Sequence, residues 1–128
     1  MIEKDFRSAA EIFEQQRRHS LAAKCYISLE EFKRAKELAE KSQDEELRAN
    51  VFYLNKDFGK AYECYCKIGD KHMKVRSLLG VCEESPERFE ELLEEMVELT
   101  SNMDEVQYEN IKPFLENVLI AYFSHLNH

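Results

Sequence analysis

The chain has 128 residues, enough for one domain, and 44% of them are hydrophobic while 34% are charged. Three glycines and two prolines are too few for long loops, and no apolar run approaches the ~20 residues that span a membrane, so we expect no membrane insertion. The net charge of −8 is uneven, because residues 1–82 hold 16 basic and 14 acidic side chains whereas residues 83–128 hold 2 and 12. The acidic C-terminal third would repel phosphates, which argues against nucleic acid as its partner.

An alanine followed three or four residues later by a large apolar residue recurs through the first half of the chain. The alanines fall at near-constant intervals, at positions 10, 22, 35, 49 and 61, and the pairs are Ala10/Phe13, Ala22/Tyr26, Ala35/Leu38, Ala49/Phe52 and Ala61/Tyr65. Each interval is about the length of one short helix with its turn, since ~10 helical residues make roughly three turns. The pattern predicts stacked antiparallel helices, in which the small residue admits a neighbouring helix and the large one fills the gap.

Local signals divide this first part into six helices. We expect the first helix over residues 5–17, the second from an N-cap at Ser20 and the third from about Glu30. The fourth and fifth helices are expected to start at caps Asp44 and Asp57, and the sixth to run from Asp70 to Cys82. Gly69 suits the left-handed position that ends a helix. Residues 22–26 also match residues 61–65 at an offset of 39, which indicates an internal repeat.

The pattern changes after Cys82. Ser85 and Pro86 predict the start of a helix that runs to about Thr100 and has a strongly acidic outer face. A last helical region is expected from about Asp104 to Leu126, with Pro113 restarting or kinking it near Asn110. An apolar stripe follows this region at helical spacing: Ile111, Phe114, Leu115, Val118, Leu119, Tyr122 and Leu126. The stripe either completes the core as a cap or stays partly exposed as an interface.

Residues 22–35 and 58–70 resemble the tetratricopeptide-like and coat-protein-like α-solenoids. Ala10, Phe13, Ala22 and Tyr26 fit the family's small and large positions, and so do Ala49, Phe52, Ala61 and Tyr65. The family's Trp, Leu-Gly and closing Pro are absent, and the helix pair spans about 25–27 residues instead of 34. The resemblance implies an all-α, right-handed stack of seven to eight short antiparallel helices with an atypical longer C-terminal helix. It also implies a scaffold that holds peptides, helices or sister subunits.

We accordingly expect one helical-repeat domain over residues 1–128, in which residues 6–82 are repeat-like and residues 86–128 form an acidic helix and a capping helix. The start of the chain has no signal-peptide core, so a cytoplasmic location is expected.

Motifs for catalysis or cofactor binding are not found. The four histidines are scattered, and no HExxH, P-loop or GxGxxG occurs, so we expect neither an enzyme nor a cofactor. Cys64, Cys66, His72 and Cys82 contain zinc-ligand types, but residues 64 and 66 lie about 200° apart on a helix, and the spacing fits no common zinc site. Reduced, buried cysteines are the favoured interpretation of all four thiols, Cys25 included.

Two basic groups support an alternative of RNA or acidic-peptide binding. One comprises Arg17, Arg18, His19, Lys33, Arg34 and Lys36, and the other Lys67, Lys71, Lys74 and Arg76. Ordinary helix surface explains both groups more simply, because aromatic residues do not interleave with the basic ones.

The function that this sequence favours is a non-catalytic protein-interaction scaffold or adaptor, part of a larger protein or assembly. The candidate interface is Phe114, Leu115, Leu119, Tyr122 and Phe123. The partner is another protein or peptide, and a structural spacer or a self-associating segment that forms homo-oligomers is the alternative.

Overall fold

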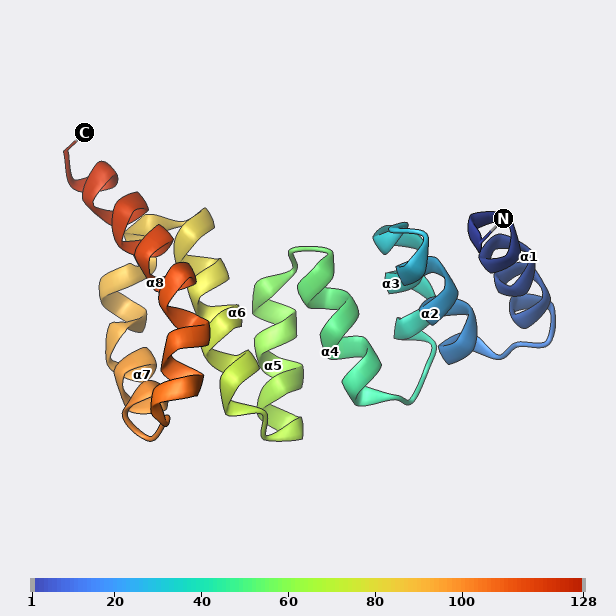
Figure 1. The fold of residues 1–128 in the computed structure, drawn as a ribbon, viewed down its shortest axis with the longest axis horizontal. Helices are drawn as coiled ribbons and strands as arrows, with labels where there is room; N and C mark the ends of the chain where they lie inside the picture. The colour runs from blue at the N-terminus through green and yellow to red at the C-terminus, as the bar shows by residue number, and fades with distance from the viewer. Residues whose placement is uncertain (1, 128) are drawn as a thin grey trace. The chain divides into compact units, whose positions relative to one another are not determined.

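A computed structural model describes the backbone of residues 2–127 and the side chains of residues 5–127 (Figure 1). Within this part of the chain there are eight α-helices, one short 3₁₀ helix and no strand. The α-helices are α1 (Ile2–Gln15), α2 (His19–Ser28), α3 (Phe32–Glu40), α4 (Glu45–Leu54), α5 (Phe58–Ile68), α6 (Lys71–Glu84), α7 (Phe89–Ser101) and α8 (Glu105–Leu126). The all-α class with a longer C-terminal helix is confirmed. The handedness of the stack stays a prediction.

The chain divides into two compact units, Met1–Cys64 and Tyr65–His128. The division falls inside α5, whereas the sequence pattern changes at Cys82. The N-terminal unit is nearly neutral, since it holds 12 basic and 13 acidic residues, while the C-terminal unit holds 6 and 13. Whether residues 1–128 behave as one domain stays a prediction.

The N-terminal unit is a sequential stack, in which α1 packs on α2, α2 on α3, and α3 on α4. All five alanines of the predicted ladder have no exposed surface, as expected for residues at helix contacts. Four of their five large partners are also buried, and Phe13 is half-buried. The alanine pattern thus predicted the core of this unit correctly.

The turns repeat as well as the helices. Arg17, Glu30, Lys56 and Gly69 each adopt positive φ, between 58° and 84°, just after a helix. In every case the next residue donates its N–H to a carbonyl five positions back, that of Phe13, Tyr26, Phe52 or Tyr65, over 2.8–3.2 Å. This is the Schellman hydrogen bond, which satisfies a carbonyl that the helix end leaves free.

The predicted offset of 39 is confirmed by these turns and by the helix starts. The same offset separates Arg17 from Lys56 and Glu30 from Gly69. It also separates the start of α2 from that of α5, and the start of α3 from that of α6. Three helices with their turns are therefore the repeating element, and the repeat ends within α6, which runs longer than α3.

Three aspartates cap helices. Asp44 and Asp70 accept the backbone N–H of Leu47 and Met73, each at 3.1 Å, as predicted. Asp104 caps α8 and forms a reciprocal capping box with Gln107. The prediction for Ser20 is wrong, because α2 begins at His19 and the Ser20 hydroxyl shares a 2.6 Å hydrogen bond with Ser42 instead.

In the C-terminal unit, α6 lies at the centre, and α7 and α8 each pack against it. Pro86 opens a 3₁₀ turn, Pro86–Arg88, so α7 begins at Phe89, later than predicted. Of the two predicted effects of Pro113, a restart near Asn110 is wrong, because α8 continues through Pro113, and a kink stays a prediction. Only one backbone N–H is lost there, and Pro113 is exposed, so that water can satisfy the freed carbonyl.

Candidate functional site

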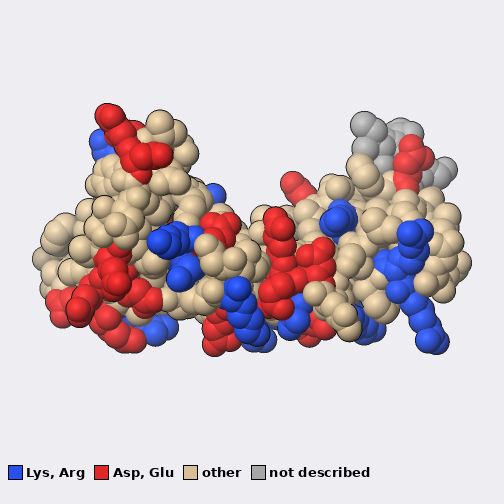
Figure 2. Space-filling view, turned by 90° about the horizontal axis from the view of Figure 1, so that it is seen from below, with Lys and Arg blue, Asp and Glu red and all other residues tan. Residues whose placement is uncertain are grey.

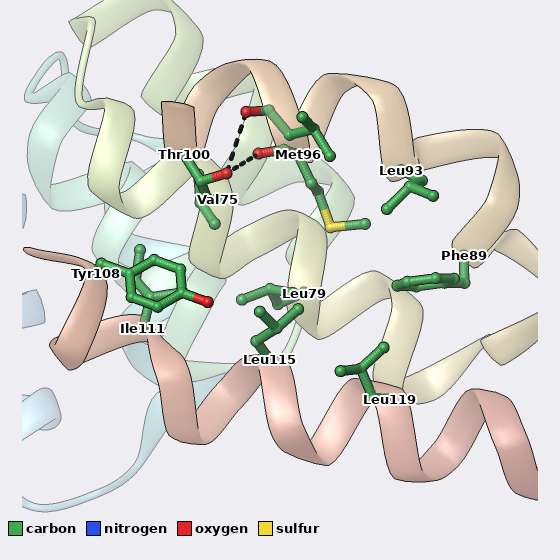
Figure 3. A pocket seen from close by; sticks show the side chains of 11 residues that line it. Val75, Leu79, Phe89, Leu93, Met96, Thr100, Tyr108, Ile111, Leu115 and Leu119 are labelled. Carbon is green, nitrogen blue, oxygen red and sulfur yellow. Dashed lines mark hydrogen bonds between the residues drawn. The ribbon is translucent and has the colours of Figure 1, made fainter. Parts of the chain in front are cut away.

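An apolar groove lies between α7 and α8, with α6 as its floor (Figure 3). Its volume is about 270 Å³. The lining consists of Val75 and Leu79 from α6, Phe89, Leu93, Met96, Val97 and Thr100 from α7, and Tyr108, Ile111, Leu115 and Leu119 from α8. All of these belong to the C-terminal unit, and we call this site the α7/α8 groove.

The floor and the rim of the groove differ in exposure. Val75, Leu79 and Ile111 are buried and fix the floor. Leu93, Val97 and Tyr108 are 41%, 56% and 41% exposed, so the rim presents apolar side chains to solvent. Such a contiguous exposed apolar surface is typical of a binding site.

The only threonine of the lining does not make the groove polar. The Thr100 hydroxyl donates to the carbonyls of Met96 and Val97, at 2.9 and 3.1 Å, within its own helix. Its hydrogen-bonding capacity as a donor is therefore used internally. The Tyr108 hydroxyl is the remaining polar side-chain group of the lining.

An aromatic contact connects α7 and α8 beside the groove. The rings of Phe89, which lines the groove, and Tyr122, which does not, lie 4.6 Å apart between centroids. The Tyr122 hydroxyl donates to the carboxylate of Glu90, and this hydrogen bond raises the pKa of Tyr122 above its usual range. Both contacts join the start of α7 to the last turns of α8.

The structure places only two of the five predicted interface residues in the groove. Leu115 and Leu119 line it. The Arg76 guanidinium carbon lies 4.2 Å from the centroid of the Phe114 ring, and Tyr122 packs against Phe89. Phe123 is 57% exposed and outside the lining.

Sequence reasoning missed the contribution of α6 and α7 to this site. The predicted interface contains residues of α8 alone, whereas Val75, Leu79, Leu93 and Val97 also line the groove. One signal was available: α7 contains no alanine and α8 contains only Ala121. Without small residues at their contact, neighbouring helices stay further apart, which leaves the space between them open.

The rim of the groove is acidic. Glu90, Glu94 and Glu98 each directly follow a lining residue of α7, and Glu109 and Glu116 each follow one of α8. One step along a helix is a rotation of about 100°, so Glu90, Glu94, Glu109 and Glu116, all exposed, lie beside the exposed rim residues. Glu98 lies about 180° around α7 from Phe89 and is therefore not at the edge of the groove. Lys112 occupies the same kind of position on α8. Figure 2 shows acidic side chains gathered over the C-terminal unit, at the lower left of the face in view.

The cysteines differ in their surroundings. Cys25, Cys64 and Cys82 are buried and form no disulfide, as predicted, whereas the prediction of burial for Cys66 is wrong because it is exposed. Burial raises the pKa of the Cys82 thiol to about 11. Among the residues that the structure describes, no three His, Cys, Asp or Glu side chains gather as a metal site would require.

Several side chains of the predicted basic groups pair within the chain. Arg34 contacts Glu14 and Glu37, and the Lys36 ammonium lies 2.8 Å from the Asp57 carboxylate. This ion pair lowers the pKa of Asp57 and raises that of Lys36. These contacts use the positive charge internally, in line with the simpler interpretation of the first group.

No helix within residues 2–127 is both long and apolar enough to cross a membrane.

Comparison with known proteins adds no family assignment. Neither the protein-family models, nor the curated proteins, nor the solved structures give a match to this chain.

Proposed function

We propose that this chain is a non-catalytic protein-interaction module of the tetratricopeptide-like, coat-protein-like type, and that the α7/α8 groove is its docking site. The observation that carries the proposal is the open apolar groove with three exposed apolar residues on its rim, Leu93, Val97 and Tyr108. Exposed apolar area of this kind is stabilised when a partner covers it. The absence of disulfides among the described cysteines fits a reducing intracellular compartment.

The open shape of the groove favours a protein partner over a small molecule. Pockets for drug-sized ligands enclose most of the ligand. The α7/α8 groove, of about 270 Å³, is open along its rim, where Leu93, Val97 and Tyr108 are exposed. Its apolar wall along α7 runs from Phe89 to Thr100, about 16 Å at the helical rise. A row of partner side chains fits these dimensions better than one compact molecule.

Self-association is the second candidate, and a different surface favours it. Ile120, Phe123 and Leu126 are 66%, 57% and 56% exposed on the last turns of α8. Figure 1 shows these turns running past the ends of α6 and α7. Sedimentation that depends on protein concentration, and is abolished by Phe123→Gln, would favour this candidate.

Binding of a neutral probe peptide tests the docking proposal. The probe is an amidated Ala/Gln helix of about 15 residues, with leucines at i, i+3, i+4 and i+7. We expect it to bind the wild-type chain and to bind Leu93→Gln/Val97→Gln at least tenfold more weakly. A control peptide of the same composition has its leucines spread around the helix and should not bind.

The matched control protein is Val106→Gln/Ile120→Gln, because both side chains are exposed on α8 outside the groove. It removes the same kind of apolar surface from the same unit. Equal binding of the probe to both double variants would contradict the proposal. Circular dichroism checks that both variants remain helical.

A further inference from the structure

We infer that the partner of the α7/α8 groove is an amphipathic helix whose apolar stripe is flanked by Lys or Arg; this inference rests on the proposed function. The groove supplies the apolar contact. The carboxylates along both edges of the groove supply the preference for a basic partner.

The shape of the groove favours a helix as the occupant. Its walls are α7 and α8, its floor is α6, and the part of the chain that the structure describes has no strand to which an extended peptide could add. The lining on α7 recurs at helical spacing over about three turns. A partner helix of similar length places anchors at i, i+3, i+4 and i+7 along the same distance.

The charge of the rim selects among such helices. The four edge carboxylates, Glu90, Glu94, Glu109 and Glu116, stand against one edge ammonium, Lys112. All five side chains are exposed. Glu90 also accepts the Tyr122 hydroxyl, which leaves three carboxylates for which the structure shows no such bond. They lie on both edges, so basic residues on either side of an apolar stripe would meet them.

The same charge disfavours a second copy of this groove as the occupant. Two α7/α8 grooves face to face would bring eight edge carboxylates together with two lysines, since each contributes four and one. Like charges across an interface cost binding free energy and slow the encounter. A basic partner gains from both effects instead.

Three peptides with one leucine stripe test the inference. They differ only in the residues that flank the stripe, which are Lys in the basic peptide, Gln in the neutral peptide and Glu in the acidic peptide. Each exposed ion pair contributes little, but several act together, so we expect the basic peptide to bind roughly tenfold more tightly than the neutral one. The acidic peptide should bind most weakly. Half-molar salt should remove most of these differences.

Charge variants localise the effect. Glu94→Gln/Glu116→Gln removes one carboxylate from each edge and should reduce the preference for the basic peptide about threefold. Glu11→Gln/Glu63→Gln removes two exposed carboxylates from the N-terminal unit and should leave the preference unchanged. Equal loss in both variants would show that only net charge matters and would overturn the inference.

The outcomes separate the inference from the proposed function. If all three peptides bind the groove with equal affinity, the docking function stands and the basic partner is wrong. If no peptide binding responds to Leu93→Gln/Val97→Gln, the docking function itself fails. If the chain forms dimers that the neutral peptide dissociates, the occupant is a second copy, and the inference is overturned.

Discussion

The two units of this protein bury their apolar residues in different ways. In the N-terminal unit α1 packs on α2, α2 on α3, and α3 on α4, and alanines with no exposed surface lie on these helices. In the C-terminal unit α7 and α8 both pack on α6, and apolar residues of α7 and α8 stay exposed along a groove. The difference follows from residue size, because alanine permits close helix contact and α7 has none. The open unit carries the proposed docking site.

Overpacking an alanine should give the largest effect and the clearest contrast between the units. Ala22→Leu places three extra carbons at a contact with no free space, so we expect a loss of about 1–3 kcal/mol in the free energy of unfolding. Ala121→Leu, at a half-buried position of α8, should cost less than about 1 kcal/mol. Urea denaturation measures both. Equal losses would contradict the difference in packing between the two units.

A reciprocal exchange tests the repeated turn that both units share. Glu30 and Gly69 occupy equivalent left-handed positions, with φ of 59° and 84°. Gly69→Glu should cost about 1 kcal/mol, because a side chain strains this conformation although the space around Gly69 is open. Glu30→Gly should stabilise the chain by roughly 0.5 kcal/mol. Thermal unfolding checks the signs, and two changes of the same sign would show that the turns are not equivalent.

Two tyrosine–carboxylate hydrogen bonds give the smallest contrast. Tyr26 is buried and donates to Glu14 over 2.5 Å, so Tyr26→Phe should cost about 1 kcal/mol at neutral pH. Tyr122 makes the same kind of bond to Glu90 at a more exposed site, and Tyr122→Phe should cost less. Urea denaturation of the two variants should reproduce this order, and the reverse order would be inconsistent with the stronger burial of Tyr26.

The Tyr26 bond also predicts a pH dependence. The hydrogen bond from Tyr26, followed by the charge of Arg34, lowers the pKa of Glu14 below 4.5, although burial acts against this. The resulting stabilisation is complete above the unfolded pKa and is lost as the pH falls through the folded one. Tyr26→Phe should therefore reduce the decrease in the free energy of unfolding at acidic pH. If this decrease is the same in the variant as in the wild type, the Tyr26–Glu14 hydrogen bond is not its cause.

Much of the fold was predictable because it depends on local signals. The alanine ladder, the caps Asp44 and Asp70, and the turn at Gly69 are each decided by side chains within a short stretch of sequence. Ser20 failed as a cap because Ser42, in a different part of the sequence, binds its hydroxyl. Pro113 does not interrupt α8, because the buried side chains around it, including Ile111 and Val118, stabilise one continuous helix.

The site was only partly predictable, since it depends on contacts between helices. The stripe on α8 identified Leu115 and Leu119, but helical spacing alone does not show which neighbours a stripe will meet. Phe114 contacts Arg76, and Tyr122 contacts Phe89 and donates a hydrogen bond to Glu90. The groove itself depends on how far α7 and α8 lie apart on α6, and the missing alanines are the one sequence feature that bears on this distance.

Methyl NMR with the neutral leucine-stripe peptide tests the central claim most directly. We predict shift changes at the methyl groups of Leu79, Val97 and Leu115, in the groove, while those of Leu38 and Val51 in the N-terminal unit stay unchanged. Binding without changes at the groove methyls, or with changes centred on Ile120 and Leu126, would contradict the assignment of the α7/α8 groove as the docking site.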